Sequence, residues 1–355
     1  MAESCDRIVY HLRKSGIVIH VIHLTETVND FVEERKVGGI DVRIPISRDI
    51  EHSLNLLYLF LEHFTKKNPI AAVVAFGGYL PVLVSPLIAI FLNKKFILFL
   101  RGNDFDIALF SPRRREILFF ALEHSSITFM NSKSKIQKIS LLKKNVKTVF
   151  LPNGIDTEAW FPSSADREAA VKIRHEFGDR TVIGLIGQLK AKKGVSYFLS
   201  TFPEDVLERV AFLFVGEVEP EISDILQKRN LIHKIYPFLN RLELIKYFLA
   251  CDTVAIPSFY EGMPNVLLEA SSLGIPCIGS GVDGIQDFFE AIDEKFLFTP
   301  LDAKSLQECV KKFLVMDGVR LKEYSENLMK QVREKYNPQI ESDTIKNKLM
   351  ELQIL

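Results

Sequence analysis

The sequence lacks an excess of either charge. Lysine and arginine together number 45, aspartate and glutamate together also number 45, and the formal net charge is zero. Proteins that bind nucleic acid through its phosphates usually carry an excess of basic residues. This chain has no such excess. We therefore expect no nucleic-acid ligand.

Cysteine is scarce. The chain of 355 residues has four scattered cysteines: Cys5, Cys251, Cys277 and Cys309. None belongs to a C-x-x-C pair, and a chain of this size needs no disulfide framework. The opening residues, MAESCDRIVYHLRKSG, are polar and mixed in charge, unlike a signal peptide. These features predict reduced thiols and a cytoplasmic protein.

One long uncharged run, residues 68–93, is long enough to span a membrane. It is interrupted by two glycines and two prolines: Gly77, Gly78, Pro81 and Pro86. A buried strand, a glycine turn and a buried helix explain this run better than a membrane span does.

Short apolar runs alternate with helical stretches in two blocks. The strand-like runs are 16–24, 70–76, 95–100, 126–131 and 147–153, then 181–187, 210–216, 253–258 and 276–280. Such alternation is typical of parallel sheets covered by helices. We expect an α/β protein with two doubly wound, Rossmann-like domains, 1–162 and 163–320, facing each other across a cleft. A helical tail, 321–355, should pack back on the first domain.

The first element that the pattern predicts is a helix, CDRIVYHLRKSG, and not a strand. A doubly wound domain usually opens with a strand and a glycine-rich turn. The first strand is therefore missing from this chain, or the domain starts unusually.

The stretch PSFYEGMPNVLLEASSLGIP, residues 257–276, places a loop after a buried strand and before a helix. Glu261 lies in the loop, and Glu269 lies about one turn inside a helix that starts near Asn265. A helix N-terminus suits a phosphate, and carboxylates accept hydrogen bonds from hydroxyls. Together they describe a nucleotide-sugar site. The alternative is a surface glutamate and a glutamate that complements the helix dipole.

Two further loops follow predicted strands. The loop IGQLKAKKG, residues 186–194, carries Lys190, Lys192 and Lys193, which can neutralise a diphosphate. A solvated lysine run is the alternative. The loop GSGVDGI, residues 279–285, offers more backbone donors through its glycine turn, a weak signal by itself.

In chain order, PNGID (152–156), G-x-L-x-x-x-K-G (187–194), FVG (214–216), the stretch 257–276 and DGI (283–285) resemble one known family. It is the family-four, retaining glycosyltransferases of the GT-B fold, called glycosyl transferases group 1. The pair Glu261 and Glu269 matches that family's E-x7-E element. The resemblance covers residues 10–340 approximately and is most specific from 150 to 290.

The resemblance implies roles by position. Lys193 would contact the donor diphosphate and stabilise the leaving group, Glu261 would hold hydroxyls of the transferred sugar, and Glu269 would bind the donor ribose. Further donor contacts would come from the backbone N–H groups of Met263, Asn265, Gly284 and Ile285. The substrate would be a nucleotide-diphosphate sugar, with no metal and no other cofactor.

The sequence departs from the family pattern at two places. Gln188 stands where the family usually has arginine, so a diphosphate cation is absent unless Lys190 or Lys192 replaces it. Arg101 stands where many members carry a histidine beside the acceptor. We expect Arg101 and Asp104 to shape the acceptor site, and a buried Arg–Asp structural pair is the alternative.

The leading hypothesis is therefore a retaining transferase that moves a sugar from a nucleotide-diphosphate donor to a glycan or a lipid-linked acceptor. A weak or inactive nucleotide-sugar-binding homologue, or a partner subunit, is the alternative. An epimerase or phosphorylase on the same fold is less well supported. Residues 111–124, SPRRREILFFALEH, join three arginines to an apolar helix face, which predicts peripheral contact with the inner membrane surface. A core-facing helix is the other interpretation.

Overall fold

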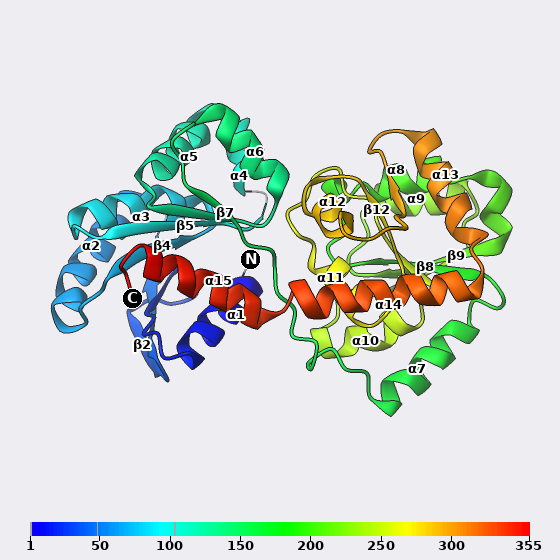
Figure 1. Cartoon of the computed structure of the whole chain (residues 1–355), viewed down its shortest axis with the longest axis horizontal. Coiled ribbons are helices and arrows are strands. Elements are labelled where there is room, and N and C mark those ends of the chain that lie inside the picture. The colour runs from blue at the N-terminus through cyan, green and yellow to red at the C-terminus, as the bar shows by residue number, and fades with distance from the viewer. Residues whose placement is uncertain (1, 48, 103) are drawn as a thin grey trace. The chain divides into compact units, whose positions relative to one another are not determined.

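The computed structural model describes residues 2–47, 49–102 and 104–355, and the chain forms two compact units (Figure 1). The first unit comprises Met1–Asn131, Lys135–Leu151 and Pro338–Leu355. The second unit comprises Ser132–Ser134 and Pro152–Asn337. Each unit has its own hydrophobic core and is described by itself.

The boundary at Leu151 lies before the one that the sequence pattern predicts, between residues 162 and 163. The intervening segment packs into the second unit. Trp160 is buried in that unit's core, and the Ile155 N–H donates to the carbonyl of Tyr336 at 2.7 Å. The polar, turn-rich composition of residues 161–170 therefore marks an exposed segment, and the change of core comes earlier in the chain.

The second unit contains a six-stranded parallel sheet in the order β10-β9-β8-β11-β12-β13. Its strands are β8 (Thr181–Ile186), β9 (Val210–Val215), β10 (His233–Tyr236), β11 (Thr253–Ile256), β12 (Cys277–Ser280) and β13 (Leu297–Phe298). The chain adds strands on one side of β8 and then continues on the other side from β11. Ligands of doubly wound sheets bind beside the carboxyl ends of strands at such a reversal. The topology thus points to the ends of β8 and β11.

Helices occupy the connections of this sheet. They are α7 (Ser164–His175), α8 (Val195–Thr201), α9 (Pro220–Lys228), α10 (Arg241–Leu249), α11 (Asn265–Ser272), α12 (Asp283–Phe289), α13 (Ala303–Leu314) and α14 (Gly318–Lys335). The connections also contain two short 3-10 helices: η1 (Ala191–Lys193) between β8 and α8, and η2 (Glu204–Arg209) between α8 and β9. Local sequence sets their starts: Ser163 and Asp166 form a reciprocal capping box at α7.

The strands of the first unit fall in two sheets. They are β1 (Val21–Thr25), β2 (Val32–Lys36), β3 (Gly39–Pro45), β4 (Ala72–Phe76), β5 (Lys95–Leu100), β6 (Ile127–Met130) and β7 (Thr148–Phe150). Strands β4 to β7 form a parallel sheet in chain order, and β1-β3-β2 form a smaller sheet with β2 antiparallel to β3. The alternating pattern predicted for this domain therefore describes β4 to β7 best.

The helices of the first unit are α1 (Ala2–Lys14), α2 (Ile50–Lys67), α3 (Tyr79–Phe91), α4 (Asp104–Leu109), α5 (Pro112–His124), α6 (Lys133–Leu142) and α15 (Pro338–Glu351). The uncharged run 68–93 forms β4, a turn at two glycines, and α3, as expected. Among the described residues, no helix combines the length and apolar character needed to cross a bilayer. In α5, Leu118, Ala121 and Leu122 are buried in the unit's own core, as the core-facing interpretation of this helix predicts.

The two ends of the chain meet in the first unit. On α1, Ile8 and Leu12 share a core cluster with Ile345 and Leu349 of α15. Within the predicted tail, α15 and the residues after it belong to this unit. Helix α14 packs into the second unit through Tyr324, Leu328 and Val332, among others. The predicted tail, 321–355, is therefore divided between the two units.

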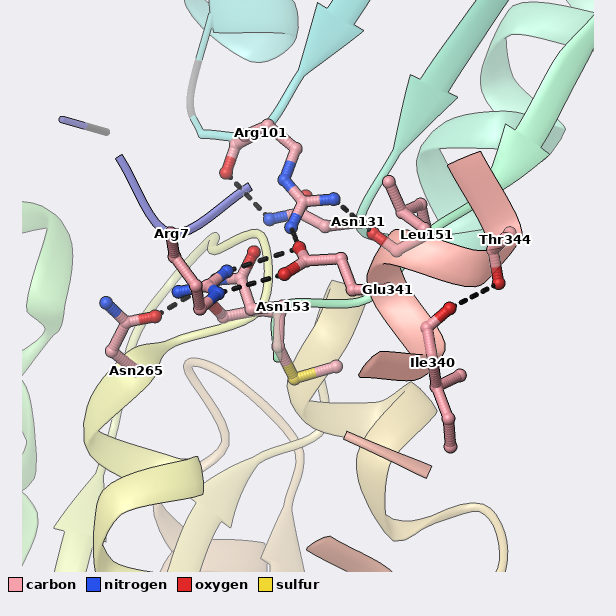
Figure 2. Close-up of polar contacts among 10 residues, drawn as sticks. Arg7, Arg101, Asn131, Leu151, Asn153, Asn265, Ile340, Glu341 and Thr344 are labelled. Atoms are coloured by element: carbon pink, nitrogen blue, oxygen red, sulfur yellow. Dashed lines mark hydrogen bonds and ion pairs between the residues drawn. The ribbon is translucent and has the colours of Figure 1, made fainter. Parts of the chain in front are cut away.

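A buried charge cluster fastens α1 and α15 to the end of β5. Arg101 and Glu341 are almost fully buried and form an ion pair, and Arg7 Nε lies 2.9 Å from the same glutamate. Figure 2 shows both guanidinium groups pointing at the Glu341 carboxylate. Arg101 also donates to the Leu151 carbonyl at 2.6 Å, and its own carbonyl accepts from Asn131 at 2.7 Å. Arg101 thus joins β5, β6, β7 and α15.

Replacing Glu341 by alanine should destabilise the first unit by about 3–5 kcal/mol, because two arginines then lose their buried counter-charge. Chemical denaturation measures this free energy of unfolding. Glu351, on the same helix, pairs with Lys348 on the surface at 2.8 Å, so Glu351→Ala should cost about 1 kcal/mol or less. Equal losses in the two variants would contradict the importance of the buried cluster.

Candidate donor-binding site

The predicted catalytic pair meets where the strand order of the second unit reverses. Lys193 ends the 3-10 turn that follows β8, and Glu261 lies in the loop that follows β11. Lys193 Nζ lies 2.5 Å from Glu261 Oε2, and the two side chains are 23% and 11% exposed. A cation and a carboxylate, separated by 68 residues in sequence, are thereby fixed side by side at the sheet edge.

The backbones of these two loops are also bonded to each other. The Phe259 N–H donates to the Lys192 carbonyl at 3.0 Å. Gly194 has a φ of 64°, and a Cβ atom there would lie 2.2 Å from the carbonyl oxygen of Pro257. Only glycine allows both this conformation and this close approach. The Lys193–Glu261 pair therefore rests on two loops held in fixed register.

The Asp283 carboxylate holds the loop of Glu261 from the other side. Its Oδ2 accepts the Glu261 N–H at 3.2 Å, and its Oδ1 accepts the Ser134 hydroxyl at 2.5 Å. Asp283 is buried and has a φ of 39°, in the left-handed region that aspartate adopts more readily than most residues. Next to it, a Cβ at Gly284 would lie 2.1 Å from the Gly262 carbonyl oxygen. The loop thus lies directly on the first turn of α12.

The helix beside the pair starts as the sequence pattern predicts. Helix α11 begins at Asn265 after an extended Pro264, and Glu269 lies one turn inside it. The buried Asn153 donates through Nδ2 to the Met263 carbonyl at 2.8 Å and to Asn265 Oδ1 at 3.0 Å (Figure 2). Asn153 thereby fixes the loop and the helix start together. First-turn N–H groups of such a helix suit an anion.

The remaining predicted donor residues differ in their surroundings. Gln188 and Lys190 have exposed side chains on the loop before η1. Ile285 is buried in the core, and its N–H donates to the Val282 carbonyl at 3.0 Å. A donor contact from this N–H would require that hydrogen bond to open. Gly284 lies at the packed turn described above.

Asp283 and Ser134 were not predicted as site residues, and Asn153 was predicted only as part of a motif. Asp283 belongs to the motif DGI (283–285), and an aspartate directly before a turn glycine is the one local signal that singles it out. Ser134 lies in the first turn of α6, far from these loops in sequence, and nothing local connects it to them. Long-range hydrogen bonds of this kind are visible only in the folded chain.

The two acceptor-side predictions lie in the first unit. Arg101 is buried and forms an ion pair with Glu341. The alternative expected from the sequence is a buried structural pair of Arg101 with an aspartate. The structure has such a buried pair, with a glutamate in place of the aspartate. Burial lowers the pKa of Arg101, and the neighbouring Glu341 charge opposes that shift. Asp104 instead accepts the Gly78 N–H at 3.1 Å. Arg101 is therefore held in a buried ion pair, and Asp104 holds the turn that follows β4.

Burial raises the pKa of Cys277 to about 12, which keeps this thiol neutral at ordinary pH. Within residues 2–47, 49–102 and 104–355, no three histidine, cysteine, aspartate or glutamate side chains cluster as metal ligands would. Lys193, Glu261 and the start of α11 lie together at the ends of β8 and β11.

Comparison with solved structures identifies the fold. Sucrose-phosphate synthase of Thermosynechococcus elongatus superposes with a TM-score of 0.80 at 17% identity, over 96% of this chain and 90% of that one. HepE of Anabaena, in complex with UDP and glucose, gives a TM-score of 0.71 at 18% identity, over 87% and 86%. The α/β, GT-B fold class expected from the sequence is confirmed.

The sequence comparisons show which family the second unit resembles. Residues 166–335 match the family Glycosyl transferases group 1. The putative teichuronic acid biosynthesis glycosyltransferase TuaC of Bacillus subtilis is 25% identical over 61% of this chain. The capsular polysaccharide biosynthesis glycosyltransferase CapM of Staphylococcus aureus is 25% identical over 93% of this chain and 88% of its own length. The match to TuaC spans about half of that relative, 54%.

The matched segment makes up most of the second unit and is similar to the group 1 glycosyltransferases. The family resemblance read from PNGID, the lysine loop and the E-x7-E element is therefore confirmed.

The close packing under the loop of Glu261 can be tested with a pair of glycines. Gly284→Ala should lower stability by about 1–3 kcal/mol, because the new methyl group meets the Gly262 carbonyl and the backbone must shift. Gly281→Ala is the matched control, since its nearest contact would be an ordinary 3.6 Å, and it should change stability by about 0.5 kcal/mol or less. Thermal unfolding of both variants measures this, and a stable Gly284→Ala would refute the described packing.

Proposed function

We propose that this protein transfers a sugar from a nucleotide-diphosphate donor, with retention at the anomeric carbon and without a metal ion. The observation that carries the proposal is the Lys193–Glu261 pair at the carboxyl ends of β8 and β11, beside the start of α11. A cation and a carboxylate held 2.5 Å apart can bind adjoining parts of one ligand. The diphosphate is anionic, and the sugar next to it carries hydroxyls.

The chemistry of departure explains why a lysine is needed. When the glycosidic bond of the donor breaks, negative charge develops on the leaving nucleoside diphosphate. Lys193 and the first-turn N–H groups of α11 are positioned before the reaction, so they can stabilise that charge without reorganising. Glu261 would accept hydrogen bonds from hydroxyls of the transferred sugar, and Glu269, inside α11, would accept hydrogen bonds from hydroxyls of the ribose.

The names of the relatives support a glycan product. TuaC is named for teichuronic acid biosynthesis and CapM for capsular polysaccharide biosynthesis, and HepE was crystallised with UDP and glucose. We infer a glycan or lipid-linked acceptor of the same general kind for this chain. Exposed arginines at the start of α5, Arg113 to Arg115, support peripheral contact with an anionic membrane surface.

Lys193→Ala should lower the turnover of donor by about a hundredfold or more, because a preorganised charge on the leaving group is lost. Glu261→Gln should impair both donor binding and turnover. The measurement is release of nucleoside diphosphate from a panel of UDP-, GDP- and ADP-sugars. Lys228→Ala, at an exposed lysine of α9, is the matched control and should behave like the wild type.

The outcomes separate the main proposal from its alternative. Turnover that is unchanged in both site variants would refute the site. Donor-dependent thermal stabilisation of the wild type, without any release of nucleoside diphosphate, would instead show a binding homologue. The exposed Gln188, where the family usually has arginine, is the feature that motivates this second outcome.

Metal independence is tested by chelation. If Lys193 and the start of α11 supply the charge stabilisation, turnover should stay the same after dialysis against EDTA and on addition of Mg²⁺ or Mn²⁺. A loss of turnover with EDTA that Mg²⁺ restores would show that a divalent cation takes part in catalysis.

A further inference from the structure

The parallel strands of the first unit are interrupted between β1 and β4. Strand β1 is the edge of the smaller sheet, β1-β3-β2, and β4 is the edge of the larger sheet, β4-β5-β6-β7. Within the described ranges, no strand pairs with the second side of β1 or of β4. We call these two unpaired sides the edge pair. A doubly wound domain usually has one continuous sheet, so the edge pair marks a break in it.

Strand β4 has the sequence of an interior strand and the exposure of an edge. Its five residues, AVVAF, are all apolar, yet Val74 is 50% exposed. In the neighbouring β5, every residue from Phe96 to Leu100 is buried. Natural proteins protect exposed edges with charges or proline, as the sequence VEERK does for β2 at the far edge of the smaller sheet. Strand β4 lacks such protection, which indicates that a further strand covers it.

The same helices cover both sheets, one helix on each face. On one face, α3 packs on β4, and its Val84 shares a core cluster with strand β3. On the other face, Leu12 of α1 shares a cluster with Phe99 of β5, and Arg13 forms an ion pair with Asp41 of β3 at 2.6 Å. Since β2 is exposed at every residue, β1 is the edge of the smaller sheet that faces β4. The two sheets therefore form one interrupted layer.

A strand added at the edge pair has a defined direction. Strand β1 is parallel to β3, and helix α2 joins β3 to β4, as a helix joins parallel strands. Helix α1 runs the opposite way. Near its start, Arg7 Nε lies 2.9 Å from Glu341, the partner of Arg101 at the end of β5. Near its end, Arg13 donates to the Ile19 carbonyl, just before β1, at 2.6 Å. A strand that leads into α1 therefore completes a strand–helix–strand unit with β1.

We propose that the edge pair binds one extended apolar strand, parallel to both β1 and β4, whose carboxyl end leads into the start of α1. The sheet then has the order β2-β3-β1-X-β4-β5-β6-β7, where X is the added strand. Helices cover both faces of X, so its side chains are apolar on both faces. The proposal does not depend on the donor site, because the edge pair belongs to the first unit and the Lys193–Glu261 pair to the second.

Hydrogen exchange on the full chain measures the pairing strand by strand. The probe is the peptide acetyl-KKVIVVIG-amide, and its control, acetyl-KKVIPVIG-amide, carries a proline that cannot bond within a central strand. We expect the probe to slow exchange in β1 and β4 about tenfold or more and to leave β2 unchanged. The probe sequence fused to Ala2 through a Gly-Ser-Gly-Gly loop should also raise the thermal midpoint by about 4 °C or more.

Two valine substitutions give a matched pair of variants. A strand at the edge pair covers Val74, so Val74→Lys should weaken binding of the probe about tenfold or more, because the new ammonium group loses contact with water. Val32→Lys changes a valine of similar exposure, 42%, in the charged strand β2, and it should leave binding unchanged. Both variants should fold, since both side chains are half exposed without the probe.

Protection of β1 and β4 in the fused chain supports the proposal even if the free probe does not bind, because fusion raises the effective concentration of the strand. No protection in the fused chain, protection of β2 in place of β1 and β4, or an equal effect of the proline control would overturn it. Equal affinity of the two valine variants would do the same. Exchange in β1 and β4 that slows with protein concentration alone would assign the edge pair to a second copy of the chain, which also overturns the proposal.

Discussion

The reversal of strand order between β8 and β11 is the constraint on which the rest of the site depends. It brings together the carboxyl ends of two strands whose loops carry opposite charges, and Lys193 and Glu261 form their ion pair there. At 23% and 11% exposure the pair is neither fully solvated nor buried. Each partner orients the other, and both remain within reach of a ligand.

The backbone around the pair is fixed by contacts that leave little room for other residues. Gly194 approaches the Pro257 carbonyl and Gly284 approaches the Gly262 carbonyl, so the loops lie backbone against backbone. Asn153 and Asp283 then bond the loop of Glu261 from two sides. Rigid support of this kind is what electrostatic stabilisation requires, because a charge that must reorganise during the reaction loses much of its effect. In the first unit, Arg101 has a comparable structural role at the ends of β5 to β7.

Much of this could be predicted from sequence because it depends on local patterns. The apolar runs predicted the central strands, Pro264 and Asn265 marked the start of α11, and the glutamate spacing placed Glu269 one turn inside it. The strands that sequence reasoning missed include β2, β10 and β13, which are sheet edges, mostly exposed or very short, with no alternation to recognise. Strand β3 was missed although Ile40, Val42 and Ile44 alternate with charged residues. The partnership of Arg101 with Glu341 spans 240 residues, so no local pattern could reveal it.

The central claim is that Lys193 and Glu261 bind one nucleotide-sugar. The most direct measurement is a crystal structure with the nucleoside diphosphate that stabilises the protein most in a thermal screen. The account predicts a diphosphate oxygen about 3 Å from Lys193 Nζ. It also predicts that the phosphates lie at the start of α11 and that Glu269 contacts the ribose. A nucleotide bound elsewhere, with Lys193 still paired to Glu261 and away from the phosphates, would contradict it.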